Sequence, residues 1–168
     1  ETGIVAWDGE AMGELEVRGP WVVGSYYHAD DGAERFTSDG WFRTGDLVSI
    51  HPDGCIQIRD RTKDVIKSGG EWVSSVALEN AIMGHPAVAE AAVIGVPEPK
   101  WMERPIAIVV CKPGQSVTHE ALVAFLEPQF PKWWMPDATE FVDALPKSGA
   151  GKFQKSVLRE RFAQRLQR

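Results

Sequence analysis

The chain has 168 residues, of which 43% are apolar and 25% are charged, and its formal net charge is −6. This length suits one ordinary domain, or a small domain with part of another, and the apolar content is sufficient for a hydrophobic core. No apolar run is long enough to cross a bilayer, and the first residues lack the basic-then-apolar plan of a signal peptide. We therefore expect a folded, cytoplasmic protein without a transmembrane segment.

The charges are unevenly distributed along the chain. Residues 1–60 contain twelve acidic and four basic residues, whereas residues 146–168 contain seven basic residues and only Glu160 as an acid. The acidic first third argues against general nucleic-acid binding. For the basic tail we predict mainly a solvated helix face, with contact to a small polyanion as the alternative.

The two cysteines, Cys55 and Cys111, lie in strand-like surroundings and form no CxxC or Cys/His grouping. The four histidines are scattered, and none stands at metal-ligand spacing from another. We predict that both cysteines are packed free thiols and that the chain's own side chains form no metal site.

The first sixty residues are predicted to form short strands joined by turns. Alternating or continuous apolar patterns indicate strands over residues 13–19, 41–50 and 55–59, separated by Ser-Asp-Gly and Pro-Asp-Gly turns. So few strands have little means of burying both of their faces. We expect this β-rich piece, residues 1–62, to be the end of a larger domain.

From about Lys63 the pattern changes to alternating helices and strands. Capping Ser and Thr residues, helical apolar spacing and Gly or Pro stops predict three helices, over residues 74–85, 118–130 and 156–168. Apolar runs predict three strands, over residues 89–96, 104–111 and 138–145. Residues 63–168 are therefore predicted to be a compact α+β domain.

Three stretches could carry chemistry. In PKSGAGKFQK, small residues present Lys152 as a point charge for a phosphate, but the P-loop spacing is missing, and alone this stretch predicts a surface turn. In WFRTGDL, the Asp46 carboxylate could accept hydrogen bonds from two neighbouring hydroxyls, although a plain turn is the simpler interpretation. DRTKDVIKSGGEW, residues 60–72, is too charged for a core strand and too ordered for a linker. It is compatible with a solvated hairpin or a phosphate-handling loop.

In combination these stretches resemble the closing motifs of the adenylate-forming enzymes. GELEVRGPWVVGSYY, DGWFRTGDLVSIHPDGCIQIRDRTKDVIKSGGEW and LPKSGAGKFQK follow the family's order and spacing. DRTKDVIKSGGEW and KWWMPDA are most similar to medium- and long-chain fatty acyl-CoA ligases. The resemblance covers essentially the whole chain. It implies an α+β fold in which the small, mobile C-terminal domain of acyl-CoA synthetases follows a β-rich piece of the large N-terminal domain.

The resemblance also implies an activity. Family members join a carboxylate to ATP, forming an acyl adenylate and pyrophosphate, and the CoA thiol then attacks the adenylate to give acyl-CoA and AMP. A fatty acid, ATP and CoA are the implied substrates, with Mg²⁺ held mainly through ATP and the N-terminal domain. The family's nucleotide-gripping Ser/Thr/Gly-rich loop is not found in these residues. The chain by itself is therefore expected to be inactive and to act with the N-terminal domain. The resemblance is also compatible with a full-length protein that forms a homodimer.

Individual residues match the family's functional positions. Lys152 matches the catalytic lysine that contacts the substrate carboxylate and the α-phosphate. Asp46 matches the ribose-binding aspartate, and Arg61 matches an arginine at the domain junction that reaches the nucleotide. Lys63 lies at the pivot, where fatty acyl-CoA ligases often carry lysine and many relatives carry aspartate.

The turn in KSGGEW matches the loop that lines the pantetheine channel for CoA. The implied channel residues are Lys67, Gly69, Gly70, Glu71 and Trp72. Trp72 stands where several short-acyl relatives have arginine, so no phosphate contact is assigned to it. Trp133 and Trp134 are expected to pack in the core or between domains rather than against a cofactor. Trp101, Glu103 and Arg104 are expected in a loop, with contact to the adenine end of CoA as the less favoured alternative.

Two other functions remain open. The acceptor thiol could belong to a carrier protein, as in a fatty acyl-AMP ligase or a carrier-protein-loading adenylation domain, although the SGGEWVSS run favours CoA. The chain could also be a non-catalytic binding fragment. The presence of Lys152, Asp46 and Arg61 speaks against that interpretation.

Overall fold

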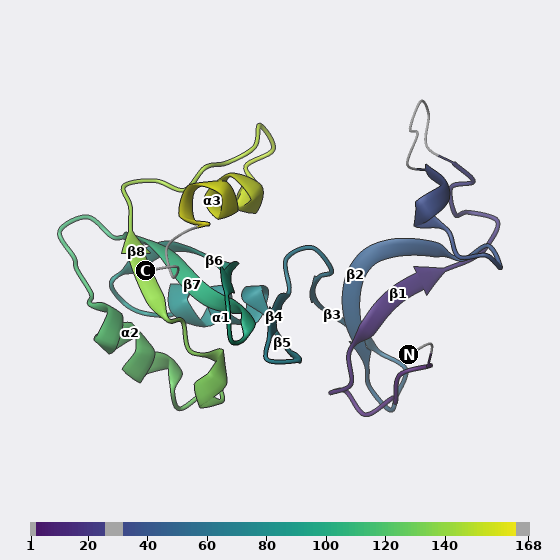
Figure 1. The fold of residues 1–168 in the computed structure, drawn as a ribbon, viewed down its shortest axis with the longest axis horizontal. Helices are drawn as coiled ribbons and strands as arrows, with labels where there is room; N and C mark the ends of the chain where they lie inside the picture. The colour runs from purple at the N-terminus through teal and green to yellow at the C-terminus, as the bar shows by residue number, and fades with distance from the viewer. Residues whose placement is uncertain (1–2, 26–31, 164–168) are drawn as a thin grey trace. The chain divides into compact units, whose positions relative to one another are not determined.

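The computed structural model describes residues 3–25 and 32–163 of the chain (Figure 1). These residues form two compact units, which meet in sequence between Lys63 and Asp64. Each unit has its own sheet, and the two sheets share no strand.

The first unit is built on a three-stranded antiparallel sheet in the order β1-β2-β3. All three strands occur where the apolar patterns predict them, and a short 3-10 helix, η1, precedes β2. The Pro-Asp-Gly turn joins β2 to β3, where the Asp53 carboxylate accepts a hydrogen bond from the Cys55 amide at 3.0 Å. This bond lowers the pKa of the Asp53 carboxyl. The elements are β1 (Gly13–Val17), η1 (Gly32–Arg35), β2 (Phe42–Ile50) and β3 (Ile56–Arg61).

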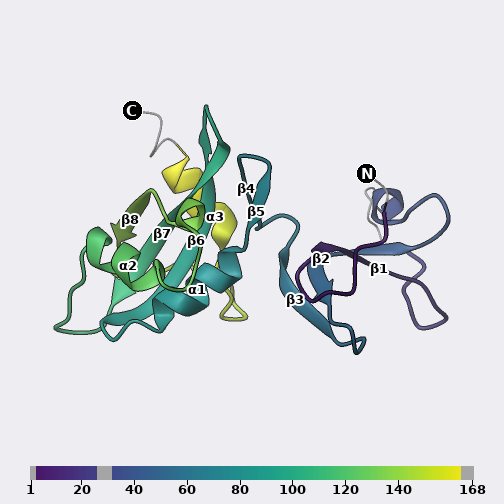
Figure 2. The same cartoon turned by 90° about the horizontal axis from the view of Figure 1, so that it is seen from below.

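The second unit combines a mixed sheet with three α-helices (Figures 1 and 2). Its sheet has the order β5-β4-β7-β6, and β8 pairs in parallel with β7. The predicted α+β class is confirmed. The elements are β4 (Ile66–Ser68), β5 (Glu71–Val73), α1 (Ser75–Met83), β6 (Val88–Glu98), β7 (Met102–Cys111), α2 (His119–Leu126), η2 (Lys132–Trp134), β8 (Ala138–Phe141) and α3 (Lys155–Phe162).

The long β6–β7 pair is buried on both faces. Alternate residues of these two strands belong to two separate hydrophobic clusters, because side chains alternate across a sheet. One cluster includes Leu78 and Ile82 of α1 and Leu122 and Leu126 of α2. The other includes Leu158 of α3. The helices therefore cover opposite faces of the same strand pair.

Helix α2 and strand β8 both end several residues before the predicted positions. Helix α2 ends at Leu126, not at residue 130, because Pro128 has no amide hydrogen and cannot continue the helix. Strand β8 ends at Phe141, not at residue 145, and its last paired residue lies opposite Val109. In α3, Leu158 is buried as its spacing predicts, whereas Leu166 lies outside the described residues.

The prediction that both cysteines are packed thiols is wrong for Cys55. Cys55 is exposed and Cys111 is half-buried, and both are free. Cys55 lies at the end of the turn before β3, a strand whose outward-facing residues are not covered by any described element of the first unit. Apolar neighbours in sequence do not bury a side chain when no element covers that face.

Helix α3 is held to the rest of the second unit by ion pairs. Lys155 Nζ lies 2.7 Å from Glu79 Oε1 and 2.7 Å from Ser75 Oγ, and the Lys155 and Glu79 side chains are only 11% and 10% exposed. The same Glu79 oxygen accepts a hydrogen bond from the Val93 amide. Arg159 pairs with Asp64 at 2.6 Å. A mainly solvated basic tail is therefore a wrong prediction for Lys155 and Arg159.

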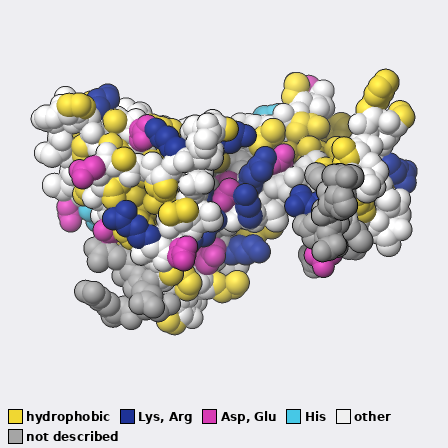
Figure 3. Space-filling model, turned by 90° about the horizontal axis from the view of Figure 1, so that it is seen from above, with side chains coloured by type: hydrophobic (Ala, Val, Ile, Leu, Met, Phe, Trp, Pro, Cys, Tyr) yellow, Lys and Arg dark blue, Asp and Glu magenta, His cyan; other side chains and the backbone are white. Residues whose placement is uncertain are grey.

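Two other described basic residues of the tail also contact neighbouring side chains. Lys147 pairs with Glu90, and Arg161 lies 5.2 Å from the ring centre of Phe162. Figure 3 shows the side of the chain on which α3 lies, where basic side chains are interspersed with acidic ones. Among the described bases of the tail, Lys147, Lys155 and Arg159 are thus neutralised by ion pairs within the fold.

Replacing Lys155 with methionine tests the buried ion pair. We expect Lys155→Met to lower the free energy of unfolding by about 3–5 kcal/mol, because the buried Glu79 carboxylate loses its cation. Urea denaturation followed by circular dichroism measures this change. Lys112→Met removes an exposed lysine from the same unit and should change stability by less than about 0.5 kcal/mol. If the two variants were equally stable, the ion pair would have no structural role.

Candidate functional site

The KSGGEW stretch forms a tight hairpin between β4 and β5. Ser68 pairs with Glu71, so the turn consists of Gly69 and Gly70, whose φ values of +62° and +88° favour glycine. Ile66 and Val73 are fully buried on the inner side of the hairpin. The stretch is therefore a hairpin of the core sheet. Its charges lie on outward positions, which is why the high charge is compatible with strands.

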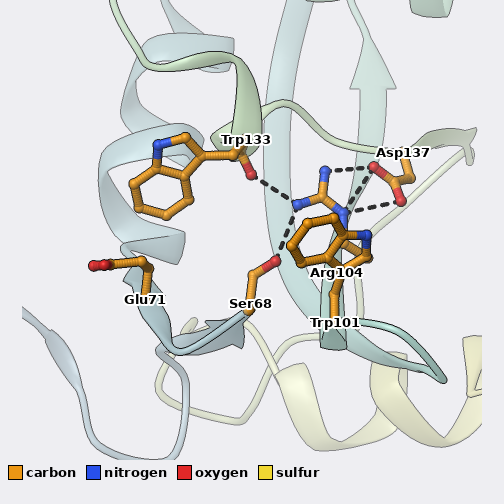
Figure 4. Close-up of a pocket in the computed structure, with 7 residues that line it drawn as sticks. Ser68, Glu71, Trp101, Arg104, Trp133 and Asp137 are labelled. Carbon is orange, nitrogen blue, oxygen red and sulfur yellow. Dashed lines mark hydrogen bonds and ion pairs between the residues drawn. The ribbon is translucent and has the colours of Figure 1, made fainter.

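A pocket of about 320 Å³ lies beside this turn (Figure 4). Three segments distant in sequence meet around it: the β4–β5 turn, the β6–β7 connection, and the stretch from η2 to β8. Its lining residues are Ser68, Gly69, Glu71, Trp101, Arg104, Trp133 and Asp137. Its size is typical of small-ligand pockets, which commonly combine aromatic walls with a few polar groups.

Trp101 packs directly on Gly69. The Gly69 amide donates to the Trp101 carbonyl at 2.8 Å, and a Cβ atom at Gly69 would lie 2.6 Å from the indole ring. At Gly70, by contrast, a Cβ atom would meet nothing within 4 Å. Gly69 is thus the glycine in close contact with a neighbouring side chain, whereas at Gly70 the structure shows a backbone conformation that favours glycine.

Met102 has a positive φ of 69°, the only such value among the described non-glycine residues. This conformation is unfavourable for a side chain as large as that of methionine. Met102 directly follows Trp101 and begins β7. The strain therefore lies at the turn that carries one aromatic wall of the pocket.

The structure separates the predicted channel residues into two groups. Gly69 and Glu71 line the pocket, and Gly70 completes the turn between them. Lys67 and Trp72 are cross-strand partners of each other and do not line it. The predicted CoA-channel role of all five residues stays a prediction.

Glu103 lies in strand β7, so its predicted placement in a loop is wrong, and Arg104 lies in the same strand, as predicted for residues 104–111 and not in the loop. The Arg104 side chain is 10% exposed and forms an ion pair with Asp137 at 2.6 Å. Glu103 accepts a hydrogen bond from the Lys67 amide at 2.9 Å. The predicted packing of the tryptophans holds for Trp134, which packs against the core and stacks on Phe130.

Sequence reasoning missed Ser68 and Asp137 as pocket residues. Asp137 reaches the pocket because its amide donates to the Pro105 carbonyl and β8 then runs parallel to β7. Both residues lie within stretches that resemble the family, but nothing in those stretches indicates that the two side chains meet. Only the pairing of strands far apart in sequence brings them to the pocket.

Lys152 lies on a small hydrogen-bonded turn before α3. The Ser148 amide donates to the Lys152 carbonyl at 2.8 Å, and Lys147 pairs with Phe153 at the base of the turn. Phe153 packs on the same hydrophobic cluster as α3. The Lys152 side chain is exposed and makes no ion pair or hydrogen bond with another described residue. A fixed backbone thus presents an available ammonium group.

The Lys152 turn and the Gly69-Gly70 turn lie well apart in the second unit. The first is joined to the sheet face covered by α3, whereas Ile66 and Val73 of the hairpin belong to the cluster under α1 and α2. Figures 1 and 2 both show the two turns on different sides of the unit.

In the first unit, Asp46 and Arg61 are brought together by strand pairing. They are cross-strand partners in β2 and β3, and Arg61 Nε lies 3.1 Å from Asp46 Oδ1. Arg61 is largely exposed, while Asp46 is half-buried. The pair therefore offers a carboxylate oxygen and free guanidinium donors at one surface position.

Lys63 is exposed in the turn that connects the two units. Before it, the Thr62 amide donates to the Gly45 carbonyl of the first unit at 2.9 Å. After it, Asp64 is fixed to the second unit by Arg159. Lys63 thus lies between the hydrogen bond that fixes Thr62 to the first unit and the ion pair that fixes Asp64 to the second.

Two further properties concern the described residues alone. No group of three or more His, Cys, Asp or Glu side chains among them is arranged to hold a metal ion. In the same part of the chain, no helix is long and apolar enough to span a membrane.

Comparison with known proteins identifies the class of domain. Residues 77–152 match the family model of the AMP-binding enzyme C-terminal domain. The chain therefore carries the C-terminal domain of the AMP-binding, adenylate-forming enzymes, and the resemblance seen in its motifs is confirmed.

The similarity to individual proteins extends over nearly the whole chain. It is 49% identical over 92% of its length to a long-chain-fatty-acid–CoA ligase of Thermus thermophilus, and 50% identical over 92% to a 3-methylmercaptopropionyl-CoA ligase of Ruegeria pomeroyi. The match spans 29% and 28% of these relatives, respectively. Among solved structures, ATP-bound MatB from Rhodopseudomonas palustris has a TM-score of 0.88 at 36% identity, over 99% of this chain and 33% of that one.

Alanine substitutions at the two turn glycines separate their roles. Gly70→Ala should cost about 1–2 kcal/mol of stability, from the backbone conformation alone. Gly69→Ala should cost more, because its Cβ also displaces the Trp101 ring. In a Trp101→Ala background the two costs should become equal. Urea denaturation of the parent, the three single variants and the two double variants measures this. An equal cost of both alanines beside an intact Trp101 would contradict the close contact.

Proposed function

We propose that the chain is the C-terminal part of an ATP-dependent fatty acyl-CoA ligase. The observation that supports this most directly is the pair of separated turns in one unit. One presents an available lysine, and the other forms a glycine-rich wall beside an aromatic pocket. Acyl-CoA synthesis in this family has two half-reactions, and each turn suits one of them.

In the first half-reaction, Lys152 would approach the carboxylate and the α-phosphate of ATP. Both groups are anionic, so a fixed cation between them offsets their repulsion and stabilises the charge that grows on the phosphorus-bound oxygens. The ammonium group of Lys152 is exposed and has no partner in the described part of the chain, so it is suited to this role. Mg²⁺ would arrive with ATP.

The Asp46–Arg61 pair is proposed to hold the nucleotide. A carboxylate can accept hydrogen bonds from the two ribose hydroxyls, and a guanidinium group can donate to phosphate or ribose oxygens. The 3.1 Å contact between the two side chains orients them before ATP binds.

In the second half-reaction, the pocket beside Gly69 is proposed to hold CoA. Trp101 and Trp133 offer aromatic surfaces to a flat base, and stacking on tryptophan contributes about 1–3 kcal/mol per base. A carrier protein brings the same pantetheine arm without an adenine. The aromatic walls therefore favour CoA over a carrier protein as the acceptor.

The first unit is proposed to be the end of the N-terminal domain, with Lys63 as the pivot. Among the described residues of this unit, only Leu47 and Val48 are buried apolar side chains, whereas Ile56 and Ile58 of β3 are exposed. An apolar strand face of this kind favours packing against further protein. Rotation of the second unit at Lys63 would then replace the Lys152 turn with the Gly69-Gly70 turn at the same active site.

The residues that select the carboxylic acid substrate are proposed to lie outside this chain segment. Relatives named for a long-chain fatty acid and for 3-methylmercaptopropionate are equally similar to this chain. A fatty acid is the proposed substrate class because the DRTKDVIKSGGEW and KWWMPDA stretches resemble the fatty acyl-CoA ligase branch.

Replacing Lys152 tests the first half-reaction. In the full-length protein, Lys152→Ala should reduce pyrophosphate exchange with a fatty acid by roughly 10²–10³-fold, the typical effect of removing one transition-state donor. Transfer from preformed acyl adenylate to CoA should continue. Lys112→Ala is the matched control and should preserve both activities. Equal loss of both half-reactions in Lys152→Ala would exclude the proposed role.

Replacing Lys63 tests the pivot. Lys63→Pro fixes φ near −65° and so restricts rotation at the connection between the units. We expect pyrophosphate exchange to persist and thioester formation from preformed adenylate to be lost, whereas Lys63→Ala should retain both. Stopped-flow measurement of each half-reaction distinguishes these outcomes. Normal thioester formation by Lys63→Pro would place the pivot elsewhere.

A further inference from the structure

Arg104 uses its whole hydrogen-bonding capacity inside the pocket wall. A guanidinium group has five N–H donors. Nε lies 3.0 Å from both Asp137 oxygens, and Nη2 donates to Asp137 at 2.6 Å and to the Met135 carbonyl at 3.1 Å. Nη1 donates to Ser68 Oγ at 3.0 Å and to the Trp133 carbonyl at 2.7 Å. No donor is left for a ligand, so Arg104 is not suited to bind a phosphate.

The acceptors of Arg104 belong to the segments that form the pocket. Ser68 directly precedes the Gly69-Gly70 turn, and Trp133 provides an aromatic wall (Figure 4). Asp137 directly precedes β8. One buried cation therefore sets the distance between the glycine turn and the Trp133 segment.

We propose that Arg104 is a positioning residue for the acceptor: it holds the Gly69 turn and Trp133 at the separation that admits CoA, without contacting CoA itself. This inference rests on the proposed function of the pocket. Lysine cannot replace arginine here, because a single ammonium nitrogen has three donors and cannot span the distance from Ser68 to Asp137. Loss of the guanidinium group would leave buried carbonyls unpaired and allow the walls to move apart.

The geometry separates this role from adenylation. The Lys152 turn is joined to the opposite face of the sheet, through Phe153 and the cluster under α3. A displacement of the pocket walls should therefore affect the thioester step and spare the step that uses Lys152.

The test uses the full-length protein with a fatty acid that supports pyrophosphate exchange. Arg104→Lys should raise the KM for CoA roughly tenfold or more, since small misplacements of a binding group have effects of this size or larger. The rate of pyrophosphate exchange should not change. Asp137→Asn, which keeps the size of the side chain and removes its charge, should shift the KM for CoA in the same direction by less. If Arg104→Lys does not fold, the Asp137→Asn variant tests the proposal in its place.

Arg43→Lys is the matched control, because it makes the same replacement in an exposed ion pair with Glu16. An unchanged KM for CoA in both pocket variants would overturn the inference, as would an equal loss of exchange and thioester formation. Trp101→Ala separates this failure from that of the proposed function. If Trp101→Ala raises the KM for CoA and the Arg104 and Asp137 variants do not, only the positioning role fails. If the unmodified protein forms no thioester with CoA, both proposals fail.

Discussion

Burial of the β6–β7 pair on both faces is the constraint on which the second unit depends. Strands that are apolar on both faces need a cover on each side, and the chain supplies α1 and α2 on one face and α3 on the other. This arrangement separates the Lys152 turn from the glycine hairpin. The division between the two proposed half-reactions thus follows from the way the core is covered.

Several charged residues connect segments that are distant in sequence. Lys155 joins α3 to Glu79 of α1, and Arg159 joins the same helix to Asp64, directly after the connection between the units. Arg104 joins the strands of the sheet to the segment before β8. Lys152 differs from these residues, because its side chain is exposed and has no partner among the described residues. A cation without a partner is available to a substrate.

Local patterns predicted the strands and helices well, but not their ends or neighbours. Pro128 shortens α2, and Cys55 is exposed because none of the described elements of the first unit covers the start of β3. The β4–β5 hairpin was obscured by its charges, which occupy outward positions while Ile66 and Val73 are buried. The motif residues were found because each lies within a recognisable stretch. The pocket could not be predicted, because Ser68, Arg104 and Asp137 meet only through the pairing of β4, β7 and β8.

The sequence by itself determined the α+β class, since capping residues, apolar periods and glycine turns act over short distances, and it identified the motif residues through their resemblance to the family. Tertiary structure alone decided which face each turn occupies, that Arg104 is buried with all of its donors engaged, and that Gly69 is the glycine in contact with Trp101. These features depend on contacts between residues far apart in the chain. Such contacts are created by the burial of β6 and β7 and leave no local signal in the sequence.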